Sequence, residues 1–81
     1  MEAVILYTCD IWKSWNSAKV VGVYTNIRKL KKQLRKMIKK NVIEIDENCP
    51  YPKSLKDWDI RMMQNSINYC ILEEINLNKE V

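Results

Sequence analysis

The most informative absence in this 81-residue chain is histidine, of which there is none. Histidine changes its charge near neutral pH, so it is the usual general base and the commonest metal ligand. Without it the chain cannot build the Ser-His or Cys-His pairs that activate nucleophiles. The composition therefore argues against most forms of enzymatic catalysis.

Glycine and paired cysteines are also scarce. Gly22 is the only glycine, whereas phosphate-cradling loops need several, because the backbone must approach the phosphates closely. The three cysteines, Cys9, Cys49 and Cys70, have no C-x-x-C spacing and cannot complete a four-ligand zinc site without histidine. We expect reduced thiols, no metal, no cofactor and no enzymatic activity.

Long apolar runs are missing as well. No stretch approaches the ~20 apolar residues of a membrane span. The opening MEAVILYTCD has an acid at Glu2 and only seven mostly apolar residues before Asp10, which is too short and wrongly flanked for a signal peptide. We expect a cytoplasmic protein with no membrane contact, formed by one domain over residues 1–81.

The hydrophobic pattern predicts an α+β fold with the element order ββαβαβ. Residues 3–9 are a continuous apolar run typical of a buried strand, and residues 18–25 are typical of its hairpin partner. Gly22 within the second run indicates either a bulge or a close approach of the backbone. The other expected elements are a helix over 26–40, a strand over 41–46, a helix over 55–66 and a strand over 68–78. We expect both helices to cover one face of one small sheet.

Two of these elements have specific local signals. The SLKD segment at 54–57 matches a capping box, which places the start of the second helix near Leu55. The alternation of the last strand is interrupted at Glu73 and Glu74, where we expect a bulge or an exposed edge.

The helix predicted over 26–40 is the most strongly patterned segment. At about 100° per residue its apolar side chains fall within a ~100° arc, and its cations occupy the complementary ~180° with no acid among them. The helix carries +8, while the six basic and ten acidic residues elsewhere give the rest of the chain −4. The cations are Arg28, Lys29, Lys31, Lys32, Arg35, Lys36, Lys39 and Lys40.

This helix is destabilised by its own charge. It contains five like-charge pairs four residues apart, which at about 0.2–0.5 kcal/mol each destabilise it by about 1–2.5 kcal/mol. A nucleic-acid backbone or an acidic protein surface would relieve this repulsion. The chain's own acidic side chains would also relieve it if they lay alongside the helix, and the basic face would then be purely structural.

The segment over 10–17 carries two tryptophans where a hairpin turn normally carries glycine or Asn-Gly. As a recognition loop, it would use its tryptophans as interface anchors or stacking platforms, and its lysine and serines to bind phosphate or carboxylate. As a structural loop, it would use both tryptophans to cap a small core, with Asp10 and Ser17 holding the turn. The candidate binding residues are Trp12, Lys13, Ser14, Trp15 and Ser17.

Three segments carry a resemblance to a known group of proteins. A D-x-W-x-S-x-x-S loop at 10–17 leads into the strand VGVYT at 21–25, and EEINLN follows at 73–78. Together they resemble a group of small proteins carried by phages and other bacterial mobile elements. The resemblance implies a phage origin and an accessory role, such as an inhibitor that occupies a host surface, and it supplies no catalytic residue.

These observations favour a phage-type accessory protein that binds a host macromolecule stoichiometrically as an anti-defence or host-takeover inhibitor. The helix cations would steer the encounter, and Trp12 and Trp15 would anchor it. The expected partner is a host protein or protein–nucleic-acid complex in the host cytoplasm, bound by a monomer or a homodimer. One alternative is a nucleic-acid-binding protein that uses the 26–40 helix on phosphates. The other is an interaction module with a self-neutralised basic face.

Overall fold

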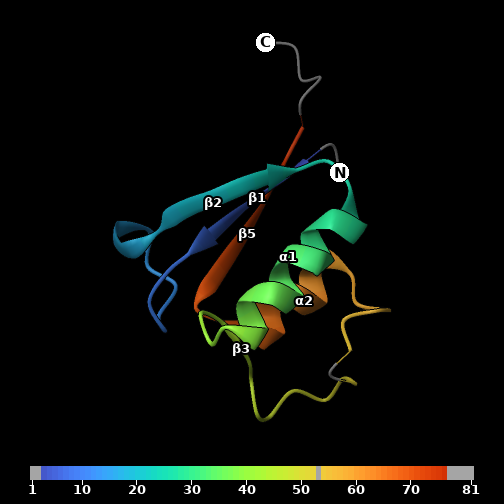
Figure 1. The fold of residues 1–81 in the computed structure, drawn as a ribbon. Coiled ribbons are helices and arrows are strands. Elements are labelled where there is room, and N and C mark those ends of the chain that lie inside the picture. Colours follow the sequence, from blue (N-terminus) through green and yellow to red (C-terminus); the bar gives the residue numbers. More distant parts are fainter. Residues whose placement is uncertain (1–2, 53, 77–81) are drawn as a thin grey trace.

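The computed structural model describes residues 3–52 and 54–76, and it confirms the α+β fold class (Figure 1). The elements in chain order are β1 (Ala3–Thr8), the 3-10 helix η1 (Trp15–Ser17), β2 (Lys19–Tyr24), α1 (Ile27–Lys39), β3 (Glu44–Ile45), α2 (Ile60–Ser66), β4 (Ile67–Asn68) and β5 (Cys70–Ile75).

The strands form two sheets rather than the expected single one. The main sheet has the antiparallel order β2-β1-β5, and β3 and β4 pair as a separate two-stranded ladder. The last expected strand is divided because Tyr69 has a φ of 71°, a left-handed conformation that does not continue a strand. The order is therefore ββαβαββ, and the expected strand end at 77–78 lies outside the described residues.

The bulge expected near Gly22 is present. Leu6 lies opposite Gly22 and Tyr7 lies opposite Val20, so Val21 is the extra residue on β2. As a result, β2 curves at this point and both Val20 and Val23 face the same side of the sheet as their partners on β1.

Of the two alternatives expected at Glu73 and Glu74, a bulge or an exposed edge, the structure shows no bulge. The β1–β5 register runs without interruption from Ala3 opposite Ile75 to Thr8 opposite Cys70. Glu73 fits within the regular strand because its carboxylate accepts a hydrogen bond from the Tyr7 hydroxyl at 2.7 Å. The alternative expectation, an edge position, is confirmed, since β5 ends the β2-β1-β5 order.

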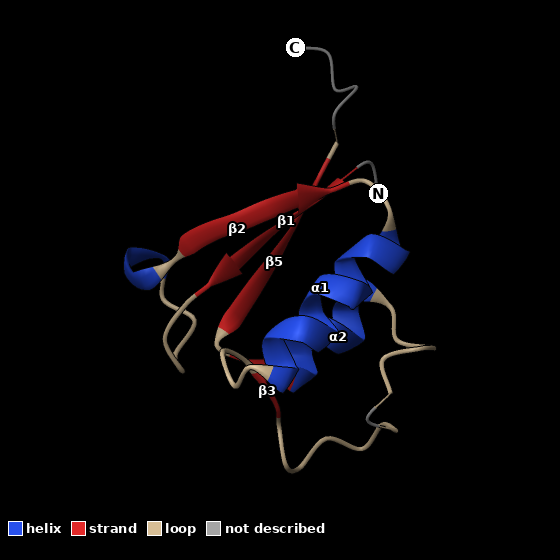
Figure 2. Ribbon diagram, viewed as in Figure 1, coloured by secondary structure: helices blue, strands red, loops and turns tan. Residues whose placement is uncertain are grey.

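Both α-helices cover one face of the main sheet (Figure 2). Side chains alternate along a strand, and Val4 and Leu6 of β1 point toward the helices. They are fully buried in one cluster with Leu30 and Leu34 of α1 and Met63 of α2. The apolar arc predicted for the 26–40 helix is therefore the arc that α1 buries.

The second helix begins later than its capping box indicated. Leu55 has a φ of 63° and cannot be a helical residue, although its side chain is buried in the core. The N-cap is Asp59, whose carboxylate accepts a hydrogen bond from the Met62 amide at 2.8 Å. A better cap and the burial of Leu55 thus override the SLKD signal.

The strand expected over 41–46 is shortened to Glu44–Ile45. Asn41 has a φ of 61°, as is common just after a helix, and the Val42 amide donates to the Met37 carbonyl at 2.9 Å. These residues therefore complete the end of α1 before the chain becomes extended.

Candidate functional site

The first candidate surface is the exposed side of α1. The helix begins after Asn26, whose side chain accepts a hydrogen bond from the Arg28 amide at 2.8 Å. Every exposed residue between Ile27 and Lys39 is a lysine or an arginine. Together with Lys40 after the last turn, the exposed cations form the basic face, which consists of Arg28, Lys29, Lys32, Arg35, Lys36, Lys39 and Lys40.

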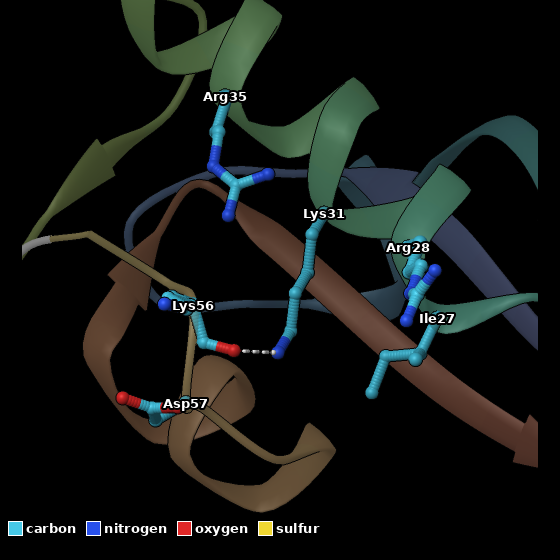
Figure 3. A pocket seen from close by; sticks show the side chains of 6 residues that line it. All are labelled: Ile27, Arg28, Lys31, Arg35, Lys56 and Asp57. Carbon is cyan, nitrogen blue, oxygen red and sulfur yellow. Dashed lines mark hydrogen bonds between the residues drawn. The ribbon is translucent and has the colours of Figure 1, made fainter.

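Lys31 differs from these seven cations because it is buried, with 9% of its surface exposed. It lies at the edge of the cationic arc, about 40° from Ile27 around the helix axis. Its stem therefore packs with the apolar arc, and its Nζ donates a hydrogen bond to the Lys56 carbonyl at 2.9 Å (Figure 3). Lys31 joins α1 to the segment before α2 and is not part of the basic face.

A pocket of about 470 Å³ lies beside Lys31. Figure 3 shows the Asp57 carboxylate directed away from Arg28 and Lys31. On the neighbouring turn of α1, the Arg35 guanidinium donates to the Ser54 carbonyl, at 3.2 Å from Nη2. The lining residues are Ile27, Arg28, Lys31, Arg35, Lys56 and Asp57.

In the part of the chain that the structure describes, no carboxylate pairs with the basic face. Within residues 3–52 and 54–76, the hydrogen bonds that the side-chain cations of α1 donate are those of Lys31 and Arg35 to backbone carbonyls. Neutral carbonyls leave the like-charge repulsion along the helix in place. The exposed side of α1 is therefore a concentrated positive surface.

The second candidate surface begins with the loop over 10–17, which is organised by Asp10. Its carboxylate accepts hydrogen bonds from the Ser14 amide at 3.0 Å and the Ser14 hydroxyl at 2.9 Å. The Asp10 amide in turn donates to Ser17 Oγ at 2.9 Å, and that hydroxyl donates to the Ser14 carbonyl at 2.8 Å. The bond from the Ser14 amide is the main cause that lowers the pKa of Asp10 below its ordinary value. Both serines thus hold the loop together.

Lys13 also has a structural contact. Its φ of 55° turns the chain at this point, and its amide donates to the Asp10 carbonyl at 3.1 Å. Its Nζ donates a hydrogen bond to the Gln64 carbonyl of α2. Of the five loop residues predicted to bind, the two tryptophans are the ones without such an anchoring role.

The two tryptophans differ in their surroundings. Trp12 is 83% exposed. Trp15 packs edge-on against Tyr7, with ring centroids 5.1 Å apart and ring planes at 87°. Neither indole caps the core, so that expectation was wrong. Trp15 packs on the sheet through its contact with Tyr7.

Val20 and Val23 extend the apolar surface around Trp15. They lie opposite Tyr7 and Ile5 of β1 and are 65% and 56% exposed. We call the set formed by Trp12, Trp15, Tyr7, Val20 and Val23 the aromatic surface. Sequence reasoning missed the valines because a β-branched run signals a strand without showing that the strand is an edge with one uncovered side.

The part of the aromatic surface formed by Tyr7, Trp15, Val20 and Val23 lies on the opposite side of the main sheet from the basic face. Tyr7 and Leu6 are neighbours on β1, so their side chains point to opposite faces. Leu6 packs in the core with α1, and Tyr7 contacts Trp15. A single flat partner surface cannot cover both.

Comparisons with protein-family models, curated proteins and solved structures found no match to this chain. The two surfaces are therefore interpreted from this chain's own residues. The described residues contain no group of three or more His, Cys, Asp or Glu side chains able to hold a metal ion. No helix among them is long and apolar enough to cross a membrane.

Proposed function

We propose that this protein is a non-enzymatic binding protein that occupies a partner protein with its aromatic surface. The observation that carries the proposal is Trp12, which holds an indole 83% exposed. Exposing so much apolar area to water is unfavourable, and tryptophan is among the residues most enriched at the energetic centres of protein interfaces.

The hydrogen bonds within the loop support this role. Asp10, Ser14 and Ser17 fix the backbone on both sides of Trp12 and Trp15. A loop that is already ordered loses less conformational entropy on binding, so more of the contact free energy appears as affinity.

The exposed edge strand β2 indicates whether the partner would be bound by side chains or by the addition of a strand. Val20, Val21 and Val23 are all exposed, and β2 is the end strand of the β2-β1-β5 order. A bulge at Val21 interrupts the regular ladder, and bulges of this kind disfavour the addition of another strand. The proposed interface therefore relies on apolar side chains rather than on backbone pairing.

The resemblance to phage and mobile-element proteins extends the proposal. The loop that carries it is the loop that presents Trp12 and Trp15. A phage-encoded protein of this kind would act in the host cytoplasm as an accessory inhibitor, and its partner would be a host protein or a protein–nucleic-acid complex.

The test is affinity capture from host lysate, followed by reconstitution with the purified partner. The wild-type protein should retain one protein in roughly equimolar amount, and nuclease treatment should not release it. The double variant Trp12→Ala, Trp15→Ala should lose that protein. Val42→Ala serves as the matched control, because Val42 is 47% exposed and lies outside the aromatic surface.

Two results would contradict the proposal. One is a captured protein that nuclease releases, because the contact would then run through nucleic acid. The other is equal retention by the double tryptophan variant and by the Val42→Ala control.

A further inference from the structure

We infer that the basic face of α1 binds the sugar-phosphate backbone of double-stranded DNA, independently of the aromatic surface. This inference does not rest on the proposed protein partner. It rests on the charge, composition and curvature of the exposed side of α1.

The basic face has the charge density of a polyanion site. From Arg28 to Lys40 the helix axis rises about 18 Å, and seven exposed cations lie along that length. Bound phosphates would relieve the repulsion between the like-charge pairs and release the counterions condensed on DNA, which is the main source of non-specific affinity.

The composition of the basic face favours DNA over an acidic protein. Five of its seven cations are lysines, and lysine is depleted from protein–protein interfaces. Since every exposed residue of α1 is charged, this surface lacks the apolar centre that a protein interface requires. Protein–DNA interfaces are instead strongly positive and polar.

The shape of the face favours a duplex over a single strand. Single-strand sites stack bases on aromatic rings, but every exposed side chain of α1 is a lysine or an arginine, and Trp15 packs on the other side of the sheet through Tyr7. The B-DNA major groove, about 12 Å wide, admits an α-helix. Arg35 and Lys40 lie about 140° apart around the helix axis, so cations on the two flanks of α1 can meet the phosphates of both strands.

The helical shape of the basic face also favours a DNA duplex over an RNA duplex. The major groove of an A-form duplex is deep and narrow and does not admit a helix. Because lysines and arginines dominate the exposed arc, the contacts should be to phosphates, with weak sequence preference.

The first experiment is a fluorescence-anisotropy titration of a duplex of about 20 base pairs, two helical turns. Neutralisation of about five phosphates gives a log–log salt slope of about −4 to −5, so affinity should fall about 500-fold between about 50 mM and about 200 mM salt. An affinity that does not change with salt would overturn the inference.

Charge-removal variants locate the site. The double variant Lys32→Gln, Lys36→Gln should reduce the magnitude of the salt slope by about 2. The matched control Lys19→Gln, Arg61→Gln removes the same charge from exposed positions on β2 and α2, and it should keep the wild-type slope. Equal losses in the two variants would assign binding to net charge and would refute a site on α1.

Competing polyanions test the choice of ligand. Single-stranded DNA, double-stranded RNA and poly-glutamate of equal charge should each bind more weakly than the DNA duplex. Tighter binding of any of them would overturn the inference. The Trp12→Ala, Trp15→Ala variant should retain full DNA affinity, and its loss would refute the independence of the two surfaces. Failure to find a protein partner would leave these DNA results unaffected.

Discussion

The carboxylate of Asp10 accepts two hydrogen bonds from Ser14, one from the backbone amide and one from the hydroxyl, at 3.0 and 2.9 Å. An aspartate that bonds the chain a few residues ahead stabilises a turn without glycine. This pair therefore explains how a loop with two tryptophans and no glycine orders itself. These hydrogen bonds also give the polar side chains of Asp10 and Ser14 a structural role that requires no bound ligand.

The Asp10–Ser14 pair predicts a pH-dependent stability. The pKa of Asp10 is lowered from 3.8, so its ionised form is favoured in the folded state. The stabilisation is complete above the unfolded-state pKa and is lost as the pH falls through the lower folded-state pKa. Asp10→Asn should therefore lower the urea midpoint at neutral pH, and the deficit should shrink in the acid range. The exposed Asp57→Asn is the control, and a deficit of Asp10→Asn that does not change with pH would contradict the assignment.

The two tryptophans should differ in their effect on folding. Trp15 is 58% exposed, and the covered part of its ring includes the edge-on contact with Tyr7. Trp15→Ala removes that contact and should destabilise the fold by about 1–2 kcal/mol. Trp12→Ala removes a side chain that is 83% exposed, and should change stability by less than about 0.5 kcal/mol. Urea unfolding of both variants gives the comparison. Equal destabilisation would mean that Trp12 packs against the fold in solution.

The sequence was sufficient to predict α1 and the first hairpin because their signals are periodic and local. The apolar arc around Leu30 and Leu34 is the buried one, and Gly22 marks the bulge. Elements whose bounds depend on tertiary contacts were predicted less well. Leu55, expected to begin the second helix, instead has a left-handed backbone and packs in the core. The left-handed backbone of Tyr69 divides the last expected strand into two. Neither event has a local signal in the sequence.

The same distinction applies to the candidate surfaces. The cationic arc was predictable from spacing, but the burial of Lys31 depends on the Lys56 carbonyl, 25 residues away in the chain. Likewise, the anchoring of Lys13 depends on a carbonyl of α2. The location of Tyr7 and Trp15 on the side of the sheet opposite the basic face requires the strand pairing, which a single sequence does not reveal.

Lys31 should behave as a structural residue. Lys31→Ala removes a buried stem and leaves the Lys56 carbonyl without its donor, and should destabilise the fold by about 1–2 kcal/mol. Lys31→Met keeps the apolar stem and should recover part of that loss. The exposed Lys29→Ala is the matched control and should be nearly neutral in thermal or urea unfolding. A Lys31→Ala variant as stable as the control would show that the contact to Lys56 contributes little.

Cys70 should be the least reactive thiol. Burial raises its pKa to about 12, so at pH 8 only about one part in ten thousand is thiolate, the reactive form. Iodoacetamide should therefore leave Cys70 unmodified in the native protein and modify it in denaturant, as followed by peptide mass spectrometry. The half-buried Cys49 is the internal reference. Native labelling of Cys70 at the rate of Cys49 would mean that the core opens readily.

Lys32 provides a test in which stability and binding change in opposite directions. It stands four residues from both Arg28 and Lys36, so Lys32→Gln removes two like-charge pairs, while glutamine and lysine have similar helix propensities. Stability should rise by about 0.4–1 kcal/mol at low salt, and the gain should vanish near 1 M salt, where the Debye length is about 3 Å. Lys32→Arg keeps the charge and should show neither effect. The glutamine variant is expected to be the more stable protein, so weaker binding of duplex DNA by this variant would not result from unfolding. A stability gain that persists in high salt would mean that charge repulsion does not destabilise α1.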